Sequence, residues 1–204
     1  MTASIARKGI AVLFAGRLAE KVIGFVALIL YARFFTPAEL ALVPLLFLFG
    51  NLGPVLFGLG IMPTLVLELP KLATTQPGKA ASLARHALSL GVVIALGAAT
   101  VTYFLAGRFT DNQPGMRDST MLWLALGVGL QGLFVVLTQL LVGTSRFVPL
   151  AVTNTVTSVL RLVLLVPLHQ VEGATGIAAG LAITGGVGCM LALWQLRALL
   201  LCKP

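Results

Sequence analysis

Long apolar segments alternate with short polar ones along the whole chain. A helix needs about 20 mostly apolar residues to cross the hydrocarbon core of a bilayer. Six segments meet that length: Gly9–Ala32, Leu40–Leu67, Ala87–Gly107, Thr120–Gly143, Val148–Leu168 and Thr175–Leu196. The polar segments between them are short and carry proline, glycine and charged residues, which favour turns. The pattern predicts an all-α bundle of about six transmembrane helices, with residues 1–204 forming a single lobe and no inserted soluble domain.

The composition agrees with a lipid-embedded chain. Hydrophobic residues make up 58% of the sequence and charged residues 10%, and the mean hydropathy is +1.04. A soluble domain has roughly 25% charged residues, which is enough to cover its surface. So few charges cannot build a water-facing surface, and a soluble fold is therefore excluded.

The basic residues outside the spans are unevenly distributed between the two predicted sides. Eight lie on the side of the termini, namely Arg7, Lys8, Lys71, Lys79, Arg85, Arg146, Arg197 and Lys203. Three lie on the opposite side, namely Arg33, Arg108 and Arg117. Because cytoplasmic loops carry an excess of lysine and arginine, we expect both termini to be cytoplasmic. The formal net charge of +8 then indicates contact with anionic lipid headgroups, and no nucleic-acid partner is expected.

The first span carries ionisable residues that are costly inside a membrane. Arg17 and Lys21 are four residues apart and share one helical face, with Glu20 beside them. Two interpretations stay open. The two cations either lie near the cytoplasmic end and extend toward the headgroups, or they form the cationic wall of a water-filled cavity.

The fifth span has one polar face. Its polar residues occur at positions 0, 3, 4 and 7 counted from the first of them, and they are Asn154, Thr157, Ser158 and Arg161. This spacing places them along one side of a helix for two turns. Arg161 is about two turns from the predicted end of the span and has room to extend toward the headgroups. The polar stripe that precedes it favours a position facing the interior of the bundle. Arg161 and Asn154 are therefore candidate substrate-binding residues, together with Arg17 and Lys21.

Three further features concern helix packing. Gln131, Thr138 and Gln139 share a face of the fourth span, and interhelical hydrogen bonds alone would explain them. The second span contains three prolines and four glycines between Pro44 and Pro63, which is compatible either with a moving helix or with a static bent one. In the sixth span, Gly176, Gly180, Thr184 and Gly188 recur every four residues and predict a ridge for close helix packing.

No group of residues suited to catalysis or to metal binding occurs in the sequence. His86 and His169 are predicted at opposite faces of the membrane, and the two cysteines, Cys189 and Cys202, have no metal-binding spacing. The acidic residues are scattered, and no glycine-rich loop with a lysine is present to hold a phosphate. We therefore expect no enzyme activity, no catalytic residue, no metal and no cofactor.

Several motifs resemble those of bacterial polysaccharide flippases. These are the Wzx-type O-antigen translocases and the lipid II flippases of the multidrug/oligosaccharidyl-lipid/polysaccharide superfamily. The segment 31–39, Tyr-Ala-Arg-Phe-Phe-Thr-Pro-Ala-Glu, is similar to the family's turn between its first two helices, and Arg17 and Gly24-Phe25 precede it. Further similarities are segment 57–61, the segment 145–147 and the pair Asn154 and Arg161. The resemblance extends over the whole chain.

The resemblance implies transport of an undecaprenyl-pyrophosphate-linked oligosaccharide across the bacterial inner membrane for surface polysaccharide and lipopolysaccharide biosynthesis. Family members have twelve to fourteen helices in two lobes around a central cavity, whereas this chain supplies the equivalent of the N-terminal lobe. The expected partners are membrane lipids, the lipid-linked oligosaccharide and a second six-helix lobe, as a homodimer or as a separate chain. The alternatives are a drug/cation antiporter of the same superfamily and a non-transporting membrane subunit of a glycan assembly complex.

Overall fold

The computed structural model describes residues 3–36, 61–110 and 118–201. Its helices are α1 (Ala3–Phe34), α3 (Ile61–Thr75), α4 (Pro77–Thr110), α5 (Asp118–Gly143), α6 (Phe147–Glu172) and α7 (Ala174–Leu200). Every regular element in the described ranges is a helix. The predicted all-α helical bundle is therefore confirmed.

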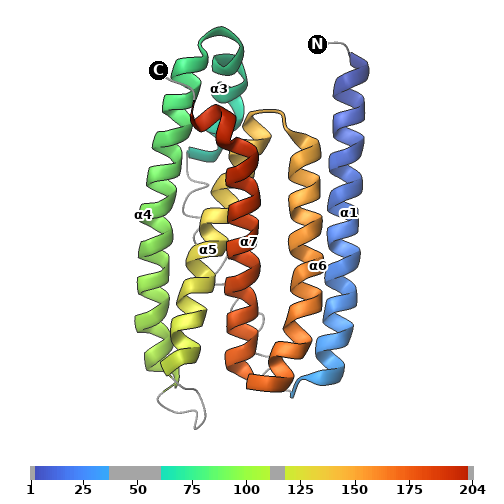
Figure 1. Ribbon diagram of the computed structural model, residues 1–204, viewed down its shortest axis with the longest axis vertical. Helices are drawn as coiled ribbons and strands as arrows, with labels where there is room; N and C mark the ends of the chain where they lie inside the picture. Colours follow the sequence, from blue (N-terminus) through green and yellow to red (C-terminus); the bar gives the residue numbers. More distant parts are fainter. Residues whose placement is uncertain (1–2, 37–60, 111–117, 202–204) are drawn as a thin grey trace.

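The long helices of the described ranges, α1, α4, α5, α6 and α7, run along the length of the bundle (Figure 1). The closest packing joins α4 to α5, α5 to α7, α7 to α6, and α6 to α1. The shorter α3 packs on α4 and α5 at the end of the bundle where both chain termini lie (Figure 1). Among the described helices, α1 is therefore peripheral and is joined to the others mainly through α6.

Within the described residues, four helices are long and apolar enough to cross a membrane: Pro77–Leu105, Ser119–Gly143, Phe147–Glu172 and Ala174–Leu200. These correspond to the predicted third to sixth spans, and they identify a membrane-protein architecture. The predicted first span corresponds to α1, whose 32 residues include Arg17, Glu20 and Lys21 in its central part. Most of the predicted second span, Leu40–Leu67, lies outside the described residues.

Two predicted loops are wrong in extent. The segment Pro70–Arg85 is almost entirely helical, since α3 continues to Thr75 and α4 begins at Pro77. Proline is favoured in the first turn of a helix, because N–H groups there have no acceptor within the helix and proline's lack of an N–H costs no hydrogen bond. The Pro77-Gly78 pair therefore begins a helix here and does not form a loop. On the opposite side, α6 and α7 are separated by Gly173 alone, which has a φ of 58° that favours glycine.

The small residues of α7 allow its neighbours to approach closely, as the sequence predicts. A Cβ atom on Gly176 would overlap the carbonyl oxygen of Leu168, and a Cβ on Gly188 would lie 2.8 Å from the ring of Phe134. Between them, Thr184 is 1% exposed. The ridge therefore seats α7 between α5 and α6 and makes it the central helix of the bundle.

A stripe of valines on α6 faces outward. The stripe follows a helical repeat and consists of Val152, Val156, Val159 and Val163, each of which is at least 41% exposed. Large apolar side chains on α1 and α4 are exposed in the same way, including Phe14, Phe25, Leu96 and Phe104. Apolar surface of this extent is unstable in water, and it matches the hydrocarbon environment that the four candidate spans require.

Candidate functional site

A cavity of about 390 Å³ lies among α1, α5, α6 and α7. Its polar lining comes from Glu20 and Lys21 of α1, Gln131 and Thr138 of α5, and Asn154, Thr157, Ser158 and Arg161 of α6. Apolar side chains such as Val128, Phe134 and Leu181 complete it. We call it the polar cavity. It is partly open, so it is accessible to a molecule from outside the bundle.

The polar face of α6 supplies half of these polar residues. Asn154, Thr157, Ser158 and Arg161 all line the cavity, while the exposed valine stripe occupies another face of the same helix. The hydroxyl of Thr157 donates to the carbonyl oxygens of Thr153 and Asn154 at 3.0 Å each. Such bonds within the helix satisfy the hydroxyl without using the cavity. The amide of Asn154 and the guanidinium of Arg161 remain the strongest polar groups on this face.

Arg161 lies deeper in its helix than the sequence indicates. Because α6 continues to Glu172, Arg161 is eleven residues from that end, or roughly 16 Å at 1.5 Å per residue. It is also about 21 Å from Phe147, the first residue of α6. The side chain is partly buried, and its Nε atom is fully buried. This mid-helix position disfavours the alternative in which Arg161 extends to the headgroups.

The two cations of α1 do not occupy the same place. Lys21 and Glu20 line the polar cavity, whereas Arg17 is exposed and is not among its lining residues. Helical spacing places Arg17 and Lys21 on one side of α1, but one turn separates them along the axis. The structure therefore brings together three of the four candidate residues, Lys21, Asn154 and Arg161, and leaves Arg17 apart from them.

Sequence reasoning gave too little weight to α5 and to Glu20. Gln131 and Thr138 line the cavity, and the hydroxyl of Thr138 donates to Val135 O of its own helix at 2.7 Å. Spacing alone did not separate residues that hydrogen-bond a neighbouring helix from residues that face a cavity. With Glu20 included, the described lining has two cations against one carboxylate. The site is therefore less cationic than Arg17, Lys21 and Arg161 together would have made it.

Contacts on both sides of the polar cavity fix α1 against α6. At one level, a Cβ on Gly16 would lie 2.9 Å from the Cβ of Ala151, so the two helices touch there. At the other level, Ala27, Tyr31 and Phe35 pack in a buried cluster with Leu165. The ring of Phe35 stacks on that of Tyr31 at 5.1 Å and meets the ring of His169 at 4.1 Å. Glu20, Lys21 and Arg161 are thus held between two apolar contacts.

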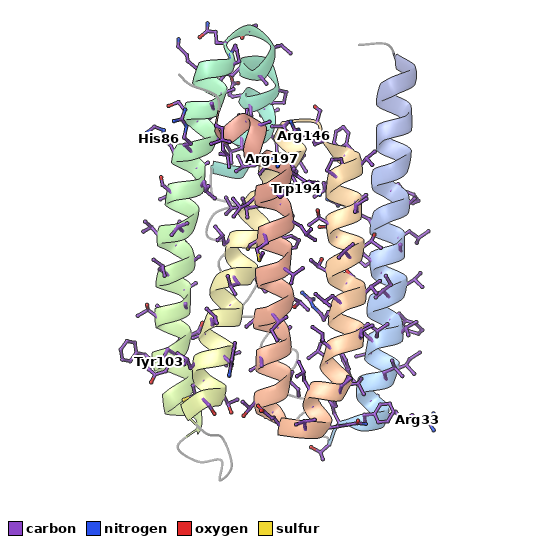
Figure 2. All side chains as sticks on the ribbon, viewed as in Figure 1. Arg33, His86, Tyr103, Arg146, Trp194 and Arg197 are labelled. Carbon is purple, nitrogen blue, oxygen red and sulfur yellow. The ribbon has the colours of Figure 1, made fainter. Side chains whose placement is uncertain are left out.

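Polar groups at the end of the bundle near the termini join α6 and α7. The amide of Gln195 donates to the hydroxyl of Thr153 at 2.9 Å, and Arg146 donates to the carbonyl oxygen of Gln195. Arg197 lies over the ring of Trp194 at 5.3 Å. Figure 2 shows Arg146, Trp194 and Arg197 gathered at this end, with Arg33 at the opposite end. The basic side chains therefore cluster where the sequence predicts the charge-rich side.

No protein-family model, curated protein or solved structure matches this chain.

Proposed function

We propose that the chain is one lobe of a flippase that moves an undecaprenyl-pyrophosphate-linked oligosaccharide across the bacterial inner membrane. The observation that carries this proposal is the polar cavity, with Arg161 at mid-helix and Lys21 and Asn154 beside it. An ionisable side chain at the depth of the bilayer centre usually marks a pathway for a substrate or an ion. Two cations in this position favour an anionic substrate.

The physical problem of such a substrate is its headgroup. A pyrophosphate carries at least two negative charges, and moving a bare anion into a medium of low dielectric constant costs on the order of tens of kcal/mol. A planar guanidinium donates two parallel hydrogen bonds to phosphate oxygens. Lys21 adds a second positive charge, and Asn154 adds amide donors. The polyprenyl chain remains in the lipid beside the bundle.

We further propose six spans with both termini in the cytoplasm. The described end of α1 and the beginning of α4 lie at opposite ends of the bundle (Figure 1), as they would if Leu40–Leu67 formed a second span. Both termini lie at the end that carries Arg146 and Arg197 (Figures 1 and 2). The excess of basic residues assigns this end to the cytoplasm.

The topology is tested by labelling single cysteines. In a background without Cys189 and Cys202, cysteine at position 79 is expected to react with a membrane-impermeant maleimide only in inverted vesicles. Cysteine at position 112 is expected to react from the outside of intact cells. Permeabilised cells are the control for reactivity at both positions. If both positions were labelled from the same side, the six-span topology would be wrong.

One observation favours the drug/cation antiporter as a second candidate. Glu20 lines the polar cavity, and a carboxylate in a span is the group that a carrier of cations requires. Glu20 is outnumbered there by Lys21 and Arg161, so the described lining favours an anion over a cation. A non-transporting subunit of a glycan assembly complex would not need a polar cavity at this depth.

Binding separates these three functions. The chain in nanodiscs is expected to bind a polyprenyl pyrophosphate at least about tenfold more tightly than the neutral polyprenol, since charge-assisted hydrogen bonds contribute about 1.5–3 kcal/mol each. Isothermal titration at low ionic strength measures both affinities. Preference for the lipophilic cation tetraphenylphosphonium would support the antiporter. Equal, weak affinity for all three probes would support a non-transporting subunit.

A further inference from the structure

Tyr31 carries a buried hydroxyl that has no hydrogen-bond partner among the described residues. The side chain is 4% exposed, and its ring stacks on that of Phe35 at 5.1 Å, with the ring planes 9° apart. This packing involves the ring alone, and a phenylalanine would fill the same space. A buried hydroxyl without a partner costs stability, because it has given up its hydrogen bonds to water. The apolar packing therefore does not explain why the residue is a tyrosine.

The cluster that contains Tyr31 borders the polar cavity. Two members of this cluster, Leu124 and Leu181, also line the cavity. Leu162, which directly follows Arg161 in α6, packs against the same cluster. Tyr31 is therefore part of the apolar wall that ends where the polar lining of the cavity begins.

The course of α1 and α6 directs the hydroxyl of Tyr31 toward Arg161. The two helices run in the same direction (Figure 1), and the ring of Phe35 meets that of His169 near their ends. Counted back from that contact, Tyr31 lies at the level of Leu165, about one helical turn beyond Arg161. Side chains lean toward the N-terminus of their own helix, so the Tyr31 ring leans toward the level of Arg161. The hydroxyl and the guanidinium interact electrostatically.

From this geometry we infer that Tyr31 is a positioning residue for Arg161, and that its hydroxyl accepts a hydrogen bond from the guanidinium when an anion occupies the polar cavity. The inference rests on the proposed function and adds a residue that is not itself among the lining residues. A guanidinium has five N–H donors and no acceptor, so one edge binds the hydroxyl while another donates to the anion. Because the hydroxyl is neutral, it orients the guanidinium without cancelling the charge that attracts the anion.

The test compares Tyr31→Phe with Tyr103→Phe. The chain contains two tyrosines, and Tyr103 is a matched control because it lies on α4, is 43% exposed and does not line the polar cavity. The whole chain is placed in nanodiscs, and its affinity for a polyprenyl pyrophosphate is measured by isothermal titration. Tyr31→Phe is expected to lower this affinity about fivefold, as for the loss of one hydrogen bond to a charged group. Tyr103→Phe is expected to stay within about twofold of wild type.

Three readouts separate positioning from packing. Without ligand, Tyr31→Phe is expected to unfold at the same or a higher temperature than wild type, because an unpaired hydroxyl is removed and the ring is kept. In an Arg161→Gln background, Tyr31→Phe is expected to cause no further loss of affinity, since the hydroxyl acts only through the guanidinium. With fluorotyrosine in place of both tyrosines, the fluorine NMR signal of Tyr31 is expected to move when polyprenyl pyrophosphate is added, and that of Tyr103 to stay.

Several results would overturn the role of Tyr31 and leave the proposed function standing. These are an unchanged affinity in Tyr31→Phe, an equal loss in the Arg161→Gln background, and a Tyr31 fluorine signal that does not respond to the probe. A loss of affinity accompanied by a lower unfolding temperature would also overturn it, because the hydroxyl would then stabilise the fold. If the wild type did not bind polyprenyl pyrophosphate, the proposed function itself would fail, and the role of Tyr31 with it.

Discussion

Replacing Arg161 by alanine is expected to lower the export of a lipid-linked glycan about tenfold or more when the partner lobe is present. The guanidinium is the largest donor on the polar face of α6, and a charge-assisted hydrogen bond contributes about 1.5–3 kcal/mol. Arg161→Lys is expected to retain part of the activity, because the charge is kept and the planar fork is lost. Export is measured with a fluorescent lipid-linked oligosaccharide in proteoliposomes, at equal amounts of inserted protein.

The control for this prediction is Arg17→Ala. Arg17 is also an arginine within a long apolar helix, but it is exposed and does not line the polar cavity. Its replacement is expected to change export by less than about twofold. Normal export by Arg161→Leu would contradict the assignment, because leucine is at least as stable as arginine in contact with lipid. Thermal unfolding in detergent separates a loss of transport from a loss of folding.

The polar face of α6 could be predicted from the sequence because helical periodicity is a strong constraint. Four polar residues at spacings of 0, 3, 4 and 7 fall on one side of any helix, and the structure directs that side at one cavity. The glycine ridge of α7 follows from the same rule. Periodicity describes a helix by itself, however, and it does not identify the neighbour that the helix faces.

Only the structure therefore shows which neighbouring helix or cavity each helix face contacts. Arg17 and Lys21 have the same periodicity, yet only Lys21 lines the polar cavity. By periodicity alone, the polar face of α5 is compatible with ordinary helix packing. In the structure, Gln131 of this face lines the same cavity as residues of α1 and α6. Helix ends were missed for another reason. A proline at the first position of a helix and a single glycine between two helices resemble a loop in composition. In the structure almost no loop forms at either place, because both residues are compatible with a helix end.

The geometry of the polar cavity leads to a prediction about the chain by itself. Its described walls belong to four helices of one bundle, and it is partly open. An oligosaccharide carries many hydroxyl groups, and each one that meets lipid without a hydrogen bond costs several kcal/mol, of the order of 4–8 in an apolar solvent. One bundle can cover one side of such a headgroup. The other side requires a second wall, which matches the two lobes that the flippase resemblance implies.

We therefore expect the purified 204-residue chain, reconstituted as a monomer, to flip a labelled lipid-linked glycan no faster than protein-free vesicles do. The oligomeric state is fixed by reconstituting at less than one chain per vesicle and is verified by counting photobleaching steps. Vesicles that contain two or more chains are the internal control. If flipping appears only in them, the second wall is another copy of this chain; if they are also inactive, a separate chain provides it. Clear activity in single-chain vesicles would contradict the prediction, because it would mean that one lobe shields the headgroup without a partner.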